Sequence, residues 1–218
     1  MKETDEIEEY ILKHIDSESN YLKRLYRDTC VNLLRPRMAS GHLQGRILKM
    51  FVEMIHPKNV LEIGTFSGYS ALCMAEGLDD NGHLYTFEIN DEQEDFTRPW
   101  IEKSPVAGKI DFIIGDALEL VPKMNITFDA AFIDGDKRQY IDYFEMVMRN
   151  LKDGGYIFVD NTLWDGHVLE QPSQSDRQTE GIIEFNDYIV NDQRIEKVIL
   201  PLRDGLTIIR KLNNKKWK

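Results

Sequence analysis

From residue 59 onwards, short apolar segments alternate with amphipathic ones, and this alternation limits the possible folds more than any other feature. Five segments each read as a short buried strand, and each of the first four is followed by a segment with helical spacing. These five segments are NVLEIG, HLYTFEIN, KIDFIIGDA, FDAAFIDGD and GYIFVDN. Strands that alternate with helices form right-handed βαβ units around a parallel sheet. We therefore predict an α/β, Rossmann-like fold with a doubly wound sheet over residues 57–218.

The two ends of the chain depart from this alternation. Residues 1–56 carry helical spacing, with the last helix over residues 41–56, and Pro36 interrupts the pattern because the residue before a proline is disfavoured in a helix. RIEKVILPL and DGLTIIRKL are strand-like runs joined by a short turn at residues 203–205, which predicts an antiparallel hairpin. We expect a single domain over residues 1–218, in which the N-terminal helices cover the site.

Charge and cysteine content exclude several classes of protein. The net charge of -11 is dispersed along the chain and disfavours a nucleic-acid partner. Cys30 and Cys73 form no CxxC pair, so we expect neither a disulfide framework nor a structural zinc site. The acidic start MKETDEIEEYILKHID does not read as a signal peptide, and no apolar run reaches the roughly 18 residues that span a bilayer. A cytoplasmic protein without membrane or nucleic-acid partners is expected.

The ends of the first three predicted strands carry the features of a nucleotide site. The turn from Gly64 to Gly68 lets backbone approach a ligand, but it lacks the GxGxxG pattern of dinucleotide sites. Glu62 would repel a pyrophosphate and suits a ligand that carries an ammonium group. Glu88 ends the second strand about 20 residues further on, where a carboxylate can accept ribose hydroxyls, and Asp116 after the third could accept an adenine amino hydrogen. Together these features describe a site for an adenosine that bears a cation rather than a diphosphate, and S-adenosylmethionine is such a molecule.

Oxygen ligands follow the fourth and fifth predicted strands. Asp134 ends the fourth strand, and Asp160 and Asn161 end the fifth. Ligands bind beyond the carboxyl ends of such strands, which lie about 4.8 Å apart, so the three side chains should converge. Two carboxylates and an amide oxygen suit Mg²⁺, Ca²⁺ or Mn²⁺ better than zinc. A hard cation beside a methyl donor could lower the pKa of an acceptor hydroxyl and fix the attacking oxygen.

The neighbours of this cluster have competing interpretations. Lys137 can face the same volume as Asp134 and act as a base if a cation lowers its pKa, but taken alone it reads as a surface lysine. Asp136 is expected to cap the helix from about residue 138 rather than to bind metal. Trp164 either walls a flat substrate or packs under a loop. The five histidines show no metal-ligand spacing.

Four motifs of the chain resemble the cation-dependent class I O-methyltransferases of the caffeoyl-CoA and catechol type. They are VLEIGTFSGYSAL, FDAAFIDGDKRQY, GGYIFVDNTLWDG and DQRIEKVILPLRDGLTIIRK. The resemblance covers nearly the whole chain, and DNTLW and DGLTI are typical of the caffeoyl-CoA branch and its bacterial relatives. It implies a seven-stranded sheet with an antiparallel last strand, which the hairpin suggests independently. It also implies S-adenosylmethionine and a divalent cation as cofactors, and a homodimer.

The resemblance further implies roles for individual residues. The implied metal ligands are Asp134, Asp160 and Asn161, and the implied catalytic residues are Lys137, as the base, and Asp134. Ser40 enters the cofactor site from the resemblance alone. The implied S-adenosylmethionine contacts are Ser40, Glu62, Gly64, Thr65, Ser70, Glu88, Asp116, Ala117 and Asp134.

The expected acceptor is a catechol-like small molecule with two vicinal hydroxyls, and a non-catechol acceptor is the alternative. Asp165 stands where the similar plant enzymes have an asparagine that contacts substrate. The stretch MASGHLQG lacks the acidic pair that those enzymes carry before the glycine. The chain also lacks an obvious match to the glutamate that holds the second catechol oxygen in animal enzymes.

Two other functional classes compete with a methyltransferase. The missing GxGxxG pattern and the acidic Glu62 argue against a dinucleotide-dependent oxidoreductase. A binding module that keeps the fold without the chemistry would have no need of Asp134, Lys137, Asp160 and Asn161 together. Each feature alone is common in proteins, and it is their order at successive strand ends that favours the enzyme.

Overall fold

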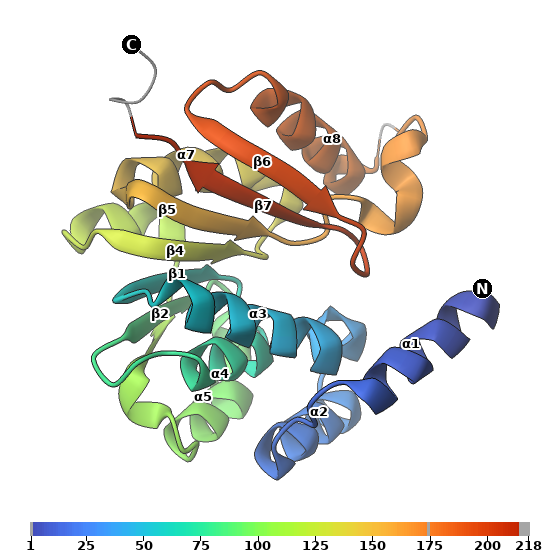
Figure 1. Cartoon of the computed structure of the whole chain (residues 1–218), viewed down its shortest axis with the longest axis vertical. Helices are drawn as coiled ribbons and strands as arrows, with labels where there is room; N and C mark the ends of the chain where they lie inside the picture. The colour runs from blue at the N-terminus through green and yellow to red at the C-terminus, as the bar shows by residue number, and fades with distance from the viewer. Residues whose placement is uncertain (1, 174, 214–218) are drawn as a thin grey trace.

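The computed structural model describes residues 2–173 and 175–213, and within them seven strands form one central sheet (Figure 1). The strand order is β3-β2-β1-β4-β5-β7-β6. Strands β1 to β5 pair in parallel, whereas β7 runs antiparallel to both β5 and β6. The predicted doubly wound sheet with an antiparallel last strand is confirmed. The strands are β1 Asn59–Ile63, β2 His83–Glu88, β3 Ile110–Ile114, β4 Phe128–Ile133, β5 Leu151–Val159, β6 Ile195–Leu200 and β7 Leu206–Lys211.

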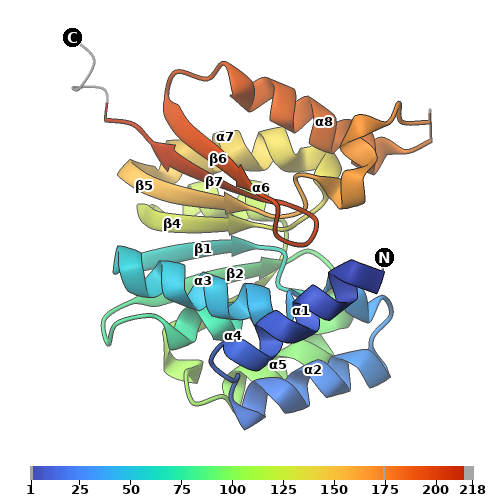
Figure 2. The same ribbon diagram turned by 45° about the vertical axis from the view of Figure 1, so that its right-hand side comes forward.

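Helices cover both faces of the sheet (Figures 1 and 2). Successive side chains of a strand point to opposite faces, so Leu61 and Ile63 pack with α6, α7 and α8, while Val60 packs with α2, α3, α4 and α5. None of the helices in residues 2–173 and 175–213 combines the length and the apolarity needed to cross a membrane. The α-helices are α1 Lys2–His14, α2 Asn20–Asn32, α3 Gly41–Ile55, α4 Tyr69–Glu76, α5 Glu94–Glu102, α6 Ala117–Leu120, α7 Tyr140–Asn150 and α8 Arg177–Val190.

Helix α3 lies unusually close to α4, and this brings the N-terminal region to the carboxyl edge of the sheet. A Cβ at Gly45 would lie only 2.6 Å from the Cys73 sulfur and 2.9 Å from the Tyr69 ring, so a larger residue would push the helices apart. The chain enters α3 through an irregular segment in which Arg35 has a φ of 57°. The helix expected over residues 41–56 is therefore present, and its position depends on a glycine.

Strand β5 begins earlier than the sequence indicates. The sequence predicted this strand only over GYIFVDN, from Gly155, but α7 ends at Asn150 and β5 already starts at Leu151. Gly154 has a φ of 80°, and the pairing register with β4 shifts at this point. The glycines thus form an irregularity inside the strand instead of a stop before it.

The β6–β7 turn lies at the carboxyl edge of the parallel strands. Because β7 is antiparallel, its first residues pair with the end of β5, with Thr207 opposite Val159. Gly205 has a φ of 89°, and a Cβ there would lie 2.6 Å from the backbone nitrogen of Leu163. The turn therefore packs directly against the loop that follows β5.

Candidate active site

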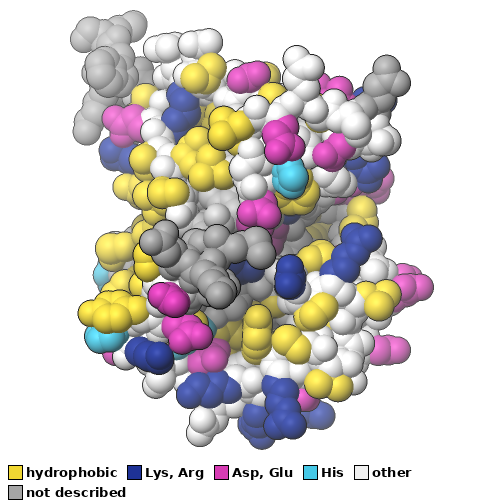
Figure 3. Space-filling view, turned by 90° about the vertical axis from the view of Figure 1, so that its right-hand side faces the viewer, with side chains coloured by type: hydrophobic (Ala, Val, Ile, Leu, Met, Phe, Trp, Pro, Cys, Tyr) yellow, Lys and Arg dark blue, Asp and Glu magenta, His cyan; other side chains and the backbone are white. Residues whose placement is uncertain are grey.

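A cavity of about 800 Å³ opens where the parallel strands end, as expected for an open α/β sheet. Its walls are the loops after β1 to β5, residues 34–38 between α2 and α3, and the β6–β7 turn. In the view of this side of the molecule, Lys and Arg side chains stand beside a hollow (Figure 3). The residues predicted from sequence that line the cavity are Gly64, Glu88, Asp116, Ala117, Asp134, Lys137, Asp160 and Asn161.

A smaller pocket adjoins this cavity, and Gly64 and Asp134 line both. Its other walls include three residues that were expected to bind the cofactor, Ser40, Thr65 and Ser70. Ser67, which was not predicted, also lines it, and its buried hydroxyl has no hydrogen-bond partner among the residues that the structure describes. Because buried hydroxyls are normally paired, Ser67 is a further candidate for contact with a polar ligand.

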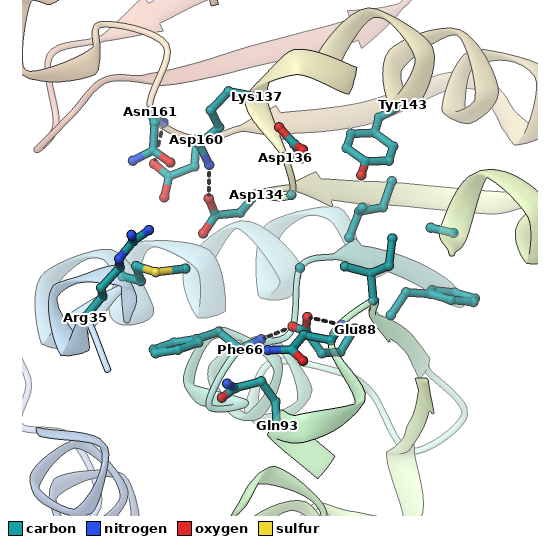
Figure 4. Close-up of a pocket in the computed structure, with 18 of the residues that line it drawn as sticks. Arg35, Phe66, Glu88, Gln93, Asp134, Asp136, Lys137, Tyr143, Asp160 and Asn161 are labelled. Atoms are coloured by element: carbon teal, nitrogen blue, oxygen red, sulfur yellow. Dashed lines mark hydrogen bonds and ion pairs between the residues drawn. The ribbon is translucent and has the colours of Figure 1, made fainter. Parts of the chain in front are cut away.

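Glu88 joins the loops after β1 and β2. One carboxylate oxygen accepts a hydrogen bond from the backbone nitrogen of Phe66 at 2.8 Å, and the other accepts from that of Asn90 at 2.9 Å (Figure 4). A carboxylate has about four acceptor positions, so two remain for ligand hydroxyls at the cavity wall. Glu88 thus holds the glycine turn and keeps acceptor positions for hydroxyls of a ligand.

Glu62 lies beneath the site and does not line either pocket. Its side chain is fully buried and accepts hydrogen bonds from the hydroxyls of Ser70 and Thr86, each at 2.5 Å. Burial raises the pKa of Glu62 to about 8, and the nearby charges of Asp134 and Glu88 add to this effect. Glu62 therefore does not touch the smaller pocket itself but bonds to Ser70, which lines that pocket.

Gly64 allows the loops after β1 and β4 to meet. It has a φ of 99°, and a Cβ at this position would collide with the backbone carbonyl of Asp134. Asp116, after β3, caps α6 by accepting from the backbone nitrogen of Leu118 at 2.8 Å. The Asp116 carboxylate also lines the cavity, so capping leaves acceptor positions for a ligand.

Asp134, Asp160 and Asn161 come together as predicted, at the ends of β4 and β5 (Figure 4). Asp160 is only 5% exposed, and burial and the neighbouring Asp134 raise its pKa. Two carboxylates in such a place are costly unless a cation compensates them. Within residues 2–173 and 175–213, no three His, Cys, Asp or Glu side chains are grouped to hold a metal. A third ligand would have to be the amide of Asn161, and the resulting all-oxygen set fits a hard divalent cation.

Lys137 is buried beside the carboxylates. Its ammonium group donates to Asp134 Oδ1 at 2.7 Å and lies 5.1 Å from the centre of the Tyr140 ring and 5.9 Å from that of Trp164. Burial favours the neutral amine, but the attraction of Asp134 outweighs it, so the pKa of Lys137 lies above its usual value. Lys137 paired with Asp134 therefore does not have the low pKa that was expected beside a cation.

The other residues weighed from sequence fall into two groups. Asp136 accepts from the backbone nitrogen of Arg138 at 3.1 Å and caps a short 3-10 turn that leads into α7, so the predicted cap is confirmed. Trp164 lines the cavity, in keeping with a substrate wall. Asp165, His42 and His167 are not among the residues that line it.

Sequence reasoning missed the residues that support the cluster from behind. Gln44 on α3 donates to Asp160 Oδ2 at 2.7 Å, Arg203 donates to Gln44, and Asp204 accepts from Asn161. The sequence did contain a signal for Arg203 and Asp204, because a hairpin that ends in an antiparallel strand must place its turn at the carboxyl edge of the sheet. No comparable signal marks Gln44, which reads as one more polar residue of an amphipathic helix.

The sequence profile of the O-methyltransferase family matches residues 13–212, almost the whole chain. The chain belongs to this family. It is 37% identical over 186 residues to caffeoyl-CoA O-methyltransferase 1 of Eucalyptus globulus, which covers 81% of this chain and 76% of the relative. It is 34% identical over 224 residues to caffeoyl-CoA O-methyltransferase 1 of Arabidopsis thaliana, which covers 97% of this chain and 86% of the relative.

Solved structures of related enzymes share the fold over nearly their full length. A methyltransferase of Podospora anserina with SAH bound superposes with a TM-score of 0.89 at 25% identity, covering 97% of this chain and 96% of that one. An O-methyltransferase of Bacillus cereus in complex with SAH gives a TM-score of 0.86 at 26% identity, covering 94% and 96%. The chain is thus an S-adenosylmethionine-dependent O-methyltransferase that acts on a small molecule.

Proposed function

We propose that the enzyme transfers the methyl group of S-adenosylmethionine to one hydroxyl of a catechol-like acceptor, with a divalent cation held by Asp134, Asp160 and Asn161. The observation that carries this proposal is the convergence of two carboxylates and an amide beside Lys137, in the same cavity as Glu88. A methyl donor and a hard-cation site would then share one cavity. This combination suits a reaction in which a hydroxyl must lose its proton before it attacks.

The protein supplies three oxygen ligands and leaves other positions open. When bound, the cation would lower the pKa of an acceptor hydroxyl, and a hard ion of this kind accepts about six ligands. Asp134, Asp160 and Asn161 leave room for two neighbouring oxygens of one acceptor. An acceptor held at two points is fixed in orientation, and orientation matters because donor sulfur, methyl and acceptor oxygen must lie in line.

Lys137 is placed to take the proton of the acceptor hydroxyl. In this structure the hydrogen bond to Asp134 favours the charged form of Lys137. When Asp134 serves as a cation ligand, its attraction for Lys137 weakens, and burial then favours the neutral amine. Lys137 can therefore act as the base in the loaded enzyme, while Trp164 lines the cavity beside it.

The cofactor would occupy the other half of the cavity. Glu88 is proposed to accept the ribose hydroxyls, and Asp116 with Ala117 to border the adenine. The methionine end would reach the smaller pocket, where Gly64 exposes backbone and where Ser40, Thr65 and Ser70 lie, with Glu62 behind Ser70. Because Gly64 and Asp134 line both pockets, this assignment would place the methyl group near the carboxylate cluster.

The test compares acceptors that differ in one hydroxyl. Caffeate, or its thioester, and the corresponding para-hydroxy monophenol are assayed with saturating S-adenosylmethionine and Mg²⁺. The catechol should be preferred by more than about tenfold in kcat/KM, since the monophenol loses one contact and its fixed orientation, a difference of at least about 1.4 kcal/mol. Equal values on the two acceptors would rule out a chelated catechol.

We also propose that the protein forms a homodimer, as the resemblance implies. Val198 and Ile199 are exposed apolar side chains on β6, the edge strand of the sheet. An exposed sheet edge with apolar side chains favours pairing with another chain. Sedimentation velocity of the purified protein should give the mass of two chains, and a monomer at all concentrations would contradict this.

A further inference from the structure

Gln44 connects the N-terminal region to a proposed metal ligand. Its amide nitrogen donates to Asp160 Oδ2 at 2.7 Å, and the two side chains are only 1% and 5% exposed. The other Asp160 oxygen accepts from the backbone nitrogen of Asn161 at 2.9 Å. The carboxylate is thus held at both oxygens, once by its neighbour in sequence and once by helix α3.

Arg203 determines which way the Gln44 amide points. Its guanidinium donates to Gln44 Oε1 at 3.1 Å and also to the backbone carbonyls of Ala39 and Ser40. A guanidinium has donors and no acceptor, so Gln44 must turn its oxygen toward Arg203 and its nitrogen toward Asp160. The same turn residue therefore anchors the start of α3 and orients the amide that bonds to the ligand.

The neighbouring Asp204 acts on a second proposed ligand. Its carboxylate accepts from the amide nitrogen of Asn161 at 3.3 Å, and its backbone carbonyl accepts from Leu163 and Trp164 at 2.7 and 3.0 Å. With the nitrogen occupied, the Asn161 side chain presents its oxygen as the free ligand atom. The β6–β7 turn thus lies behind two of the three proposed ligands.

We infer that Gln44, oriented by Arg203, is a positioning residue that holds Asp160 as a cation ligand, so that cation affinity depends on the docking of α3 against the β6–β7 turn. This inference rests on the cation site of the proposed function. Residues that orient metal ligands by hydrogen bonds typically change metal affinity or activity by about 10- to 100-fold when replaced. Because linkage is reciprocal, a bound cation should in turn stabilise the docked position of α3.

The first experiment measures Mn²⁺ binding to the purified full chain by electron paramagnetic resonance, without acceptor. Gln44→Met removes both hydrogen bonds at similar side-chain length and should raise the Mn²⁺ Kd by about 10- to 100-fold. Arg203→Met should raise it less, and the double variant should be no worse than Gln44→Met alone, because Arg203 acts through Gln44. Gln193→Met and Arg210→Met, at exposed positions next to or on the same hairpin, are the matched controls.

A purely structural role for Gln44 would give a different pattern. It would lower the melting temperature and weaken SAH binding and Mn²⁺ binding together. If Gln44 positions Asp160, SAH affinity should stay within about twofold of wild type, while the half-saturating metal concentration should rise. The rate at saturating metal should be largely restored, because only the affinity for the metal depends on the position of Asp160.

A second measurement does not depend on a variant at Gln44. Hydrogen exchange of residues 35–44 should slow when Mn²⁺ is added to the wild-type chain and should not respond in Asp160→Ala. If wild type binds Mn²⁺ and Asp160→Ala does not, but neither Gln44→Met nor exchange at residues 35–44 responds, the inference is overturned and the cation site stands. If wild type itself binds no Mn²⁺, the cation site fails and this inference fails with it.

Discussion

The two halves of the cavity obtain their hydrogen bonds from different parts of the chain. In the cofactor half, beyond β1 to β3, the partners of Glu88 are backbone groups of Phe66 and Asn90, within the loops that the strands themselves carry. In the acceptor half, beyond β4 and β5, Asp160 and Asn161 depend on Gln44 and on the β6–β7 turn. The hydrogen-bond partners of Glu88 thus come from the loops of the parallel sheet itself, whereas those of Asp160 and Asn161 include residues near both ends of the chain.

The halves also differ in their charge balance. In the cofactor half, the Glu88 carboxylate accepts one hydrogen bond at each oxygen from a backbone nitrogen. In the acceptor half, Asp134 and Asp160 crowd each other, and the buried Lys137 compensates only part of their charge. The acceptor half is therefore expected to change more than the cofactor half when a cation binds.

The largest effect should follow from removing the cation. EDTA should abolish activity and Mg²⁺ should restore it, because Lewis-acid stabilisation is worth several kcal/mol, on the order of 10⁴-fold in rate. Asp160→Ala should cost far more activity than Asp136→Ala, since Asp136 serves as a cap. Methyl transfer to a catechol is read by mass spectrometry. A rate that EDTA leaves unchanged would remove the difference between the halves.

Loss of the proposed base is the next largest effect. Lys137→Ala should lower kcat by about 10²–10⁴-fold, the usual cost of removing a general base, and should leave S-adenosylmethionine affinity nearly unchanged. The loss should shrink as pH rises, because the acceptor hydroxyl then ionises without Lys137. Pre-steady-state rates from pH 7 to 10 test this. A constant ratio of mutant to wild-type rates over that range would count against Lys137.

A smaller effect is expected in the cofactor half. Glu88→Ala should weaken S-adenosylmethionine binding by about 1.5–3 kcal/mol, the worth of a hydrogen bond to a charged group. Mn²⁺ affinity should not change, because Glu88 forms no hydrogen bond with Asp134, Asp160 or Asn161, the proposed cation ligands. Calorimetry measures both, with Asp95→Ala on the exposed surface of α5 as the control. Equal cofactor affinity in mutant and wild type would exclude Glu88 from the site.

The smallest effect is expected on the pH dependence of stability, and it tests whether Glu62 is buried beneath the site and does not face the ligand. Its pKa is raised from 4.5 to about 8 in the folded protein, so between these pH values the folded state binds more protons than the unfolded state. The free energy of unfolding should therefore fall as pH rises from 5.5 to 8.5, by on the order of 2 kcal/mol relative to Glu62→Gln. Urea titrations of the ligand-free proteins measure it. Parallel pH curves for the two proteins would show that Glu62 keeps an ordinary pKa.

Local pattern and the strand-end rule were sufficient for much of this molecule. The alternation of strands and helices predicted the parallel sheet, and the short turn at residues 203–205 predicted the antiparallel hairpin. The sequence could predict that Asp134, Asp160 and Asn161 converge, because parallel strands end at one edge of the sheet whatever packs around them. These features depend on residues near one another in the chain or on a rule that holds for every sheet of this class.

Only the tertiary structure decided how the cluster is supported and which side chains face the ligand. Gln44 reaches Asp160 because Gly45 lets α3 approach α4, and nothing in the spacing of an amphipathic helix reveals that approach. Glu62 is the second-to-last residue of β1 and Glu88 is the last residue of β2, yet Glu62 is buried under the site whereas Glu88 lines it. A strand's pattern tells which positions alternate, but the layer that covers each face sets the burial and the partners of a polar side chain, and that layer is assembled from distant segments.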